Sequence, residues 1–268
     1  MRVTISLRNI AALVIVMLLF QACATSPLGR RQLKLLPEGQ MEQMGLQAFD
    51  SLKKETPLSR DPVKNQFVKC VANAVTKVVG GDWEVVVFED KTPNAFALPG
   101  GKIGVHTGIL SVAKNQDQLA AVIGHEIGHV LAHHGNERAS QNLAVQTGMQ
   151  VASAAIPATQ LGQLAVAALG MGAKFGVLLP FSRTHESEAD LIGLELMSAA
   201  GFDPREAPKL WQNMTTASQG ASAPEFLSTH PSHATRIQDL KAYLGKVMPK
   251  YEKALAEGKR PDCDRYLK

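Results

Sequence analysis

The stretch Ala121–His134 reads Ala-Val-Ile-Gly-His-Glu-Ile-Gly-His-Val-Leu-Ala-His-His, and it decides the fold. Apolar residues recur at helical spacing from residue 116 to residue 134, which predicts a central, buried helix. They are Leu119, Val122, Ile123, Ile127, Val130 and Leu131. His125 and His129 are four positions apart, so both imidazoles lie on one face of this helix and can share one metal ion.

Glu126 completes a His-Glu-x-x-His pattern with these two histidines. A carboxylate at this position can accept a proton from a water that zinc activates. Catalytic zinc usually has three protein ligands and one open position. A third histidine at the metzincin spacing would stand at residue 135, which is Gly135, so the third ligand must come from another part of the chain.

A second predicted helix, Ser182–Ala200, offers that ligand. Glu186 and Asp190 are four positions apart and therefore lie on one face. The Glu186 carboxylate can complete the metal site. Asp190, one turn later, can accept the free ring N–H of a ligand histidine and so fix its tautomer and orientation.

Several stretches together resemble metallopeptidase family forty-eight, a gluzincin family that includes the CAAX prenyl proteases, HtpX, BepA and LoiP. The stretches are Pro27–Leu36, Asn94–Leu110, His125–His134, Ser182–Asp190 and Thr229–Ile237. The resemblance implies a zinc-dependent endopeptidase with one Zn²⁺ per chain. Its ligands would be His125, His129 and Glu186, because Glu188 has no partner at the family spacing. With no tetratricopeptide tail, the chain is expected to be nearest to the LoiP-like envelope lipoproteins.

The family also has a His-Pro and an Arg-Ile pair where this chain has His230-Pro231 and Arg236-Ile237. His230 is therefore expected to be catalytic, in one of two roles. It can be a fourth zinc ligand in a resting form, or it can donate to the oxyanion of the tetrahedral intermediate. The remaining histidines are interpreted as structural. They are His106, His133, His134, His185 and His233.

Three β runs precede the motif helix: Trp83–Phe88, Asn94–Leu98 and Lys102–His106, with a Pro-Gly-Gly turn between the last two. The expected fold is α+β, a mainly helical zincin-like metalloprotease with a small antiparallel β-sheet beside the active-site helix. Metalloproteases of this clan bind substrate as an added extended strand. Asn94, Ala95 and Phe96 are therefore expected to bind substrate, although an ordinary hairpin is the alternative.

The N-terminus has the form of a secretory signal, with Arg2 and Arg8 before the apolar run Ile10–Phe20. It ends in Phe20-Gln21-Ala22-Cys23, which resembles a lipobox. We expect a signal peptide over 1–22, a tether over 23–37 lipidated at Cys23, and a single peptidase domain over 38–268. The predicted localisation is the outer membrane, facing the periplasm; an ordinary signal peptide cut near Ala22 or Ala24 is the alternative.

Cys70 and Cys263 then remain, and in an exported protein they predict one disulfide. The stretch 139–173 contains no charged residue. It predicts two weak helices, which could form a lid over the cleft, a membrane-touching hairpin or plain core; the glycine content favours the lid.

The expected partners are protein substrates, misfolded or from the outer membrane, a membrane reached through the lipid anchor, and outer-membrane assembly proteins. Nucleic acid is excluded, because the formal net charge is only +4 and only 5% of the residues are aromatic. Two other functions compete with proteolysis. One is a non-proteolytic periplasmic chaperone or assembly factor that keeps zinc for structure, and the other is a hydrolase of non-peptide substrates.

Overall fold

The computed structural model describes residues 23–156, 159–173, 179–218, 230 and 234–267. The chain divides into two compact units, one comprising Met1–Pro37 with His133–Leu179 and the other Glu38–Ala132 with Pro180–Lys268. The predicted signal peptide over 1–22 lies outside the described residues. The larger unit carries the predicted metal ligands.

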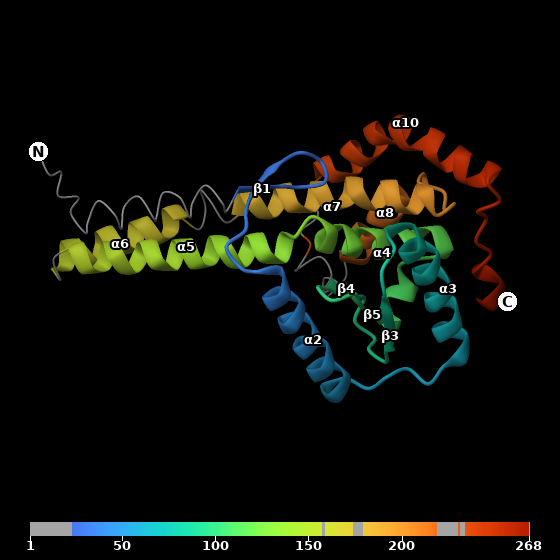
Figure 1. Cartoon of the computed structure of the whole chain (residues 1–268), viewed down its shortest axis with the longest axis horizontal. Helices are drawn as coiled ribbons and strands as arrows, with labels where there is room; N and C mark the ends of the chain where they lie inside the picture. Colours follow the sequence, from blue (N-terminus) through green and yellow to red (C-terminus); the bar gives the residue numbers. More distant parts are fainter. Residues whose placement is uncertain (1–22, 157–158, 174–178, 219–229, 231–233, 268) are drawn as a thin grey trace, which may run out of the picture. The chain divides into compact units, whose positions relative to one another are not determined.

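The sheet of the larger unit contains β3 (Glu84–Phe88), β4 (Ala95–Leu98) and β5 (Lys102–His106) in the order β3-β5-β4. Strands β4 and β5 form the antiparallel hairpin that the Pro-Gly-Gly turn predicts, and β3 pairs with β5 in parallel. The parallel pair departs from the antiparallel expectation because the chain after β3 crosses to the far edge of the sheet before it turns back. Helix α2 (Glu38–Glu55) packs beside β4, and α3 (Pro62–Val79) packs beside β3 (Figure 1).

Local signals set the ends of α3. Asp61 caps its N-terminus by accepting from the backbone N–H groups of Val63 and Lys64, and Pro62 is its first residue. Gly80, with φ of 82°, ends the helix, a backbone conformation that glycine adopts without steric cost.

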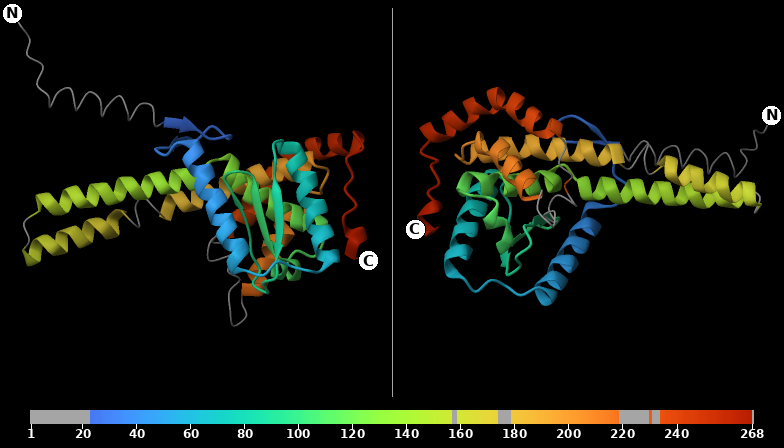
Figure 2. Two further views of the ribbon diagram at one scale, coloured as in Figure 1. Left: turned by 60° about the horizontal axis from the view of Figure 1, so that its bottom comes forward. Right: turned by 180° about the vertical axis from the view of Figure 1, so that it is seen from behind.

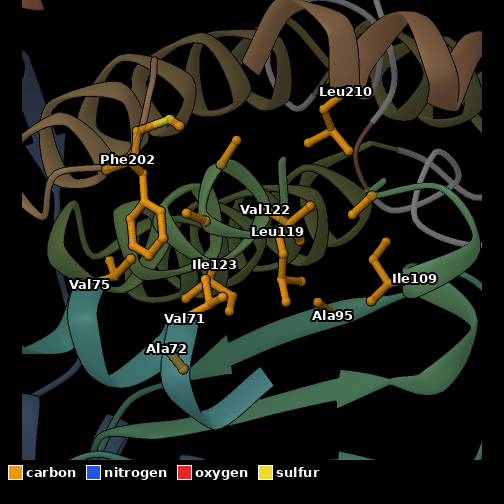
Figure 3. Close-up of a cluster of buried hydrophobic side chains, with 14 of the residues drawn as sticks. Val71, Ala72, Val75, Ala95, Ile109, Leu119, Val122, Ile123, Phe202 and Leu210 are labelled. Carbon is orange, nitrogen blue, oxygen red and sulfur yellow. The ribbon is translucent and has the colours of Figure 1, made fainter. Parts of the chain in front are cut away.

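Helix α4 (Gln116–Leu131) lies in the centre of the core, between α3 and the sheet on one side and later helices on the other (Figure 3). Those later helices are α7 (Leu179–Ala199), α8 (Glu206–Ser218) and α10 (Ala234–Ala256). Most of the apolar face predicted for α4 is buried, while Val130 and Leu131 at its end are partly exposed. Between α4 and α7 the backbones approach closely, since a Cβ on Gly124 would lie 2.9 Å from the carbonyl oxygen of Gly193 and one on Gly128 would lie 2.9 Å from that of Ala189. This contact places the two ligand-bearing helices side by side.

Helix α4 ends three residues earlier than the sequence indicates. His133 has φ of 52°, in the left-handed region, and α5 (His134–Ala155) begins directly after it. Gly135, the residue directly after the predicted helix, lies inside α5. The left-handed residue breaks the helix before the glycine is reached.

The C-terminal tail is tied to the first turn of α4. A disulfide joins Cys70 of α3 to Cys263. The Gln116 side chain accepts from the backbone N–H of Cys263 and donates to the Pro261 carbonyl, and Asp264 accepts from the backbone N–H of Gln116. The tail thus supplies partners for backbone groups that the start of a helix leaves unpaired.

In the smaller unit, β1 (Cys23–Thr25) and β2 (Arg31–Leu33) form an antiparallel pair next to the start of α5. Glu137 of α5 is fully buried and accepts from both terminal guanidinium nitrogens of Arg30, Nη1 and Nη2, and from the Gln32 side chain. The second half of the expected tether 23–37 is therefore packed against α5. None of the described helices is long and apolar enough to cross a membrane.

Helices α5 and α6 (Gln160–Ala173) run antiparallel, side by side, in both views of Figure 2. These two helices contain most of residues 139–173, the uncharged stretch that the sequence predicts to be helical. Between residues 142 and 171, Gly162 is the only buried residue among those whose side chains are described. This exposure excludes the interpretation of the stretch as plain core.

Candidate metal centre

Four side chains converge where α4 passes α7. His125 and His129 come from α4, Glu186 from α7, and His230 from the segment before α10. One ligand atom from each lies within 4.8 Å of the others. The structure thus brings together the three expected ligands and the expected catalytic histidine, from three separate parts of the chain.

The spacing of these atoms suits a tetrahedral ion. His125 Nε2 lies 3.1 Å from His129 Nε2 and 3.3 Å from His230 Nδ1. Glu186 Oε2 lies 3.3 Å from His125 Nε2 and 3.1 Å from His230 Nδ1. Ligands about 2.05 Å from a tetrahedral zinc are separated from one another by about 3.3 Å. Three imidazole nitrogens and a carboxylate at these separations therefore fit a zinc-sized ion.

Asp190 and Arg236 contact the ligand side chains of His125 and Glu186 and hold them in place. His125 Nδ1 lies 2.9 Å from Asp190 Oδ1, which turns the other ring nitrogen toward the metal position. Arg236 Nε donates to Asp190 Oδ2 at 2.7 Å, and Arg236 Nη1 lies 3.2 Å from Glu186 Oε2. Burial raises the pKa of Asp190, but the charges and hydrogen bonds of Arg236 and His125 together outweigh burial, so the net pKa is lowered. Asp190 is therefore ionised and accepts from His125.

The pKa of His125 responds to the same neighbours. Burial disfavours its charged form, but the hydrogen bonds and negative charges of Asp190 and Glu186 together outweigh that cost and raise the pKa to about 9. The pocket around His125 therefore stabilises positive charge, which a bound cation supplies equally well.

Glu126 lies beside the four ligand atoms and is not one of them. It is buried, and desolvation raises its pKa. The backbone N–H of Ala97 in β4 lies near enough to this carboxylate to oppose part of that rise in pKa. Within the described part of the chain, Oε1 has no hydrogen-bond partner, and it lies 3.5 Å from His230 Nε2. Glu126 thus presents a carboxylate oxygen that can take up a proton.

Among the described residues, β4 is an edge strand of its sheet, and its Ala97 lies near Glu126. The backbone N–H of His106 donates to the Asn94 carbonyl across the hairpin. In an antiparallel pair of strands, every second residue is hydrogen-bonded to the partner strand and the residues between point their backbone groups away from it. Phe96 therefore pairs with β5, while Ala95 and Ala97 present their backbone groups to the open edge. A peptide strand added along this edge would pass Glu126, because the Ala97 N–H lies near the Glu126 carboxylate.

The three expected substrate-binding residues differ in their surroundings. The Ala95 side chain belongs to the buried core, and its N–H is bonded to the Asn94 side chain. The Phe96 ring packs against Phe49 and Phe88 on the other face of the sheet. Their roles in binding substrate stay predictions, and only the backbone of this strand faces the edge.

Sequence reasoning missed two residues of the site. Ala97 gave no signal, since its role comes from a backbone N–H. Trp211 of α8 packs edge-on against His125, with ring centroids 5.7 Å apart, and the Arg236 guanidinium carbon lies 3.7 Å from the centre of its ring. No spacing rule connects Trp211 to the motif helix. Arg236 was visible only as part of the Arg236-Ile237 pair.

Two His and a Glu on adjacent helices, with a Glu beside them and an open strand edge, define a metallopeptidase of the gluzincin type. Residues 57–244 match Peptidase family M48, so the chain belongs to that family. The predicted family, the mainly helical fold and the enzyme class, a metalloendopeptidase, are confirmed.

Individual relatives agree with this membership. The chain is 46% identical over 171 residues to the mitochondrial metalloendopeptidase OMA1 of Schizosaccharomyces pombe, covering 63% of this chain and 49% of the relative. It is 34% identical over 223 residues to OMA1 of Danio rerio, covering 78% and 47%. It is 27% identical over 220 residues to the beta-barrel assembly-enhancing protease of Escherichia coli, covering 79% and 45%. The chain thus spans about half the length of these relatives.

The predicted localisation as an outer-membrane lipoprotein is wrong. The relatives from fission yeast, budding yeast, Arabidopsis and zebrafish are all named mitochondrial enzymes. A basic, then apolar N-terminus followed by one cysteine is a short pattern, and other targeting segments are also basic and apolar. Acylation of Cys23 depends on the same localisation and is not carried further.

Proposed function

We propose that the chain is a zinc-dependent endopeptidase that cuts extended segments of unfolded or misfolded proteins. The observation that carries this proposal is the open edge of β4 beside Glu126 and the four ligand atoms. An edge strand binds a peptide through backbone hydrogen bonds, which any extended sequence can make. A folded substrate cannot offer such a strand, so unfolded segments are preferred.

Zinc is the ion that the donor set favours. Imidazole nitrogens with one carboxylate suit zinc, whereas magnesium and calcium prefer oxygen ligands. When bound, the zinc ion would lower the pKa of a water molecule and would polarise the carbonyl group of the substrate.

The chain's own residues provide positioning and proton transfer. Asp190 holds the His125 ring so that Nε2 faces the metal position. The Glu126 carboxylate lies near the Ala97 N–H, and Glu126 Oε1 is the atom that takes a proton from water and returns it to the leaving amine. Burial raises the pKa of Glu126, which makes it a stronger base. A chaperone that used zinc only for structure would not need this carboxylate.

Removing the metal tests the proposal. We expect a chelator to abolish cleavage of unfolded casein, and we expect one equivalent of Zn²⁺ per chain to restore it. Binding should be measured as metal content, and cleavage as the release of fluorescence from labelled casein. Cleavage that persists in metal-free protein would contradict the proposal. Full metal loading with no cleavage of any unfolded protein would favour the chaperone instead.

His230 occupies the fourth ligand position, which supports the first of its two expected roles. Its Nδ1 lies as close to Glu186 and His125 as they lie to each other. Because catalysis needs an open position, His230 is proposed to hold the enzyme in a resting form.

Replacing His230 by Ala should therefore raise the basal rate of casein cleavage several-fold while weakening zinc binding. Both are measured with saturating zinc, together with a zinc titration. The variant His233→Ala, a neighbouring histidine, is the control for general effects on this segment. A fall in the rate at full zinc occupancy would assign His230 to the oxyanion role.

A further inference from the structure

The guanidinium of Arg236 joins several parts of the metal centre. Arg236 is buried, and its nitrogens reach α7 and the segment before α10. Nε and Nη2 donate to the two carboxylate oxygens of Asp190. Nη1 lies 3.2 Å from Glu186 Oε2 and 3.5 Å from the His230 carbonyl oxygen. A guanidinium donates only in its own plane, so the tilt of that plane decides whether both carboxylates are reached.

The indole of Trp211 covers one face of this guanidinium. The guanidinium carbon of Arg236 lies 3.7 Å from the centre of the ring, which is a stacking distance. The same indole packs edge-on against the imidazole of His125, with an angle of 73° between the two rings. Trp211 is thus in contact with one of the converging ligands and with the arginine that holds another.

Helix α8 fixes Trp211 relative to the start of α4. Asn213 donates to the Val112 carbonyl and to Gln118 Oε1. Glu206 accepts from the Gln118 side chain. These contacts lie on either side of Trp211 along α8, and Trp211 itself is 4% exposed. The ring is therefore held by both its helix and its packing.

We propose that Trp211 is a positioning residue of the metal centre. By stacking on Arg236, it fixes the plane of the guanidinium, and through that plane it holds the carboxylates of Asp190 and Glu186 in the arrangement that a metal ion needs. An aliphatic side chain fills similar space, but it has no π face to attract a cation. This inference rests on the metal site of the proposed function, and its first readout is metal binding rather than cleavage.

Trp211→Leu should weaken zinc binding by about tenfold or more, as does the loss of other groups that orient metal ligands. Leucine keeps the site apolar, but the Arg236 guanidinium loses the ring that fixes its plane. Zinc affinity is measured by competition with a chromophoric chelator. For cleavage of a peptide at saturating zinc, kcat should fall while KM stays within about twofold, because the buried Trp211 offers little surface to a substrate.

Phe202→Leu is the matched control. Phe202 is a fully buried aromatic residue of the same hydrophobic core, in the segment between α7 and α8 (Figure 3). We expect this variant to lose stability but to bind zinc as tightly as the unchanged chain. Trp211→Phe keeps a smaller ring face, so it should lose less zinc affinity than Trp211→Leu and more than Phe202→Leu. The phenylalanine variant carries the comparison if the leucine variant does not fold.

Arg236→Lys tests whether Trp211 acts through the guanidinium. Lysine keeps the positive charge but has no plane to fix. In that background, Trp211→Leu should lower the zinc affinity little further, since the two residues act as one unit. Full zinc affinity in Trp211→Leu would overturn this proposal alone, as would an equal loss in Phe202→Leu. An unchanged chain that bound no zinc would overturn the proposed metal site as well.

Discussion

Replacing Glu126 by Gln should lower the rate of casein cleavage by on the order of 10³-fold while zinc stays bound. Glutamine has the same shape and keeps a carbonyl oxygen near the Ala97 N–H, but it cannot take up a proton. Glu126 is not among the four converging ligand atoms, so metal content should not change. The thermal stability should not fall, because the buried carboxylate has a raised pKa and its charge is costly.

Glu188→Gln is the matched control. Glu188 is also a buried glutamate, on α7, and it is the alternative ligand that the sequence offers, but it lies outside the converging set. We expect this variant to retain both zinc and cleavage. If Glu126→Gln cleaved within about tenfold of the unchanged chain, Glu126 would not be the general base. If it lost zinc, Glu126 would be a ligand.

Features with a local signal were predictable from the sequence. The ends of α3 follow from Asp61, Pro62 and Gly80, and the common face of His125 and His129 follows from the helical period alone. Glu186 and Asp190 needed the same period on a second helix. Their meeting with α4 did not follow from spacing, because it depends on the close approach of two backbones at Gly124 and Gly128.

Features that depend on non-local pairing were not predictable. The parallel pairing of β3 with β5 has no turn signal of its own. The break of α4 at His133 depends on a left-handed residue that is not glycine, which propensity does not favour. Helix α10 continues through Pro249, although a proline inside a helix removes a backbone hydrogen bond and usually ends or kinks the helix. In each case the surrounding structure outweighs the local preference.

The largest expected effect on stability comes from Arg236. It is 1% exposed and pairs with Asp190 through Nε and Nη2, at 2.7 and 2.8 Å. Its charge is the main influence that keeps the pKa of Asp190 low against burial, and Glu186 lies within 3.2 Å of it. Removing the Arg236 guanidinium leaves the buried carboxylates of Asp190 and Glu186 without its positive charge. Breaking a buried ion pair in this way costs about 3–5 kcal/mol.

Arg236→Gln should therefore lower the melting temperature of the metal-free protein by on the order of 10 °C. Metal-free protein is used because a bound cation would replace part of the lost charge. Arg205→Gln is the control: Arg205 also pairs with an aspartate, Asp203, but it is exposed, so its loss should cost less than about 1 kcal/mol. Adding Asp190→Asn to Arg236→Gln should recover part of the stability, since it removes an uncompensated charge. Equal effects of the two arginine substitutions would mean that Arg236 does not hold the site together through its charge.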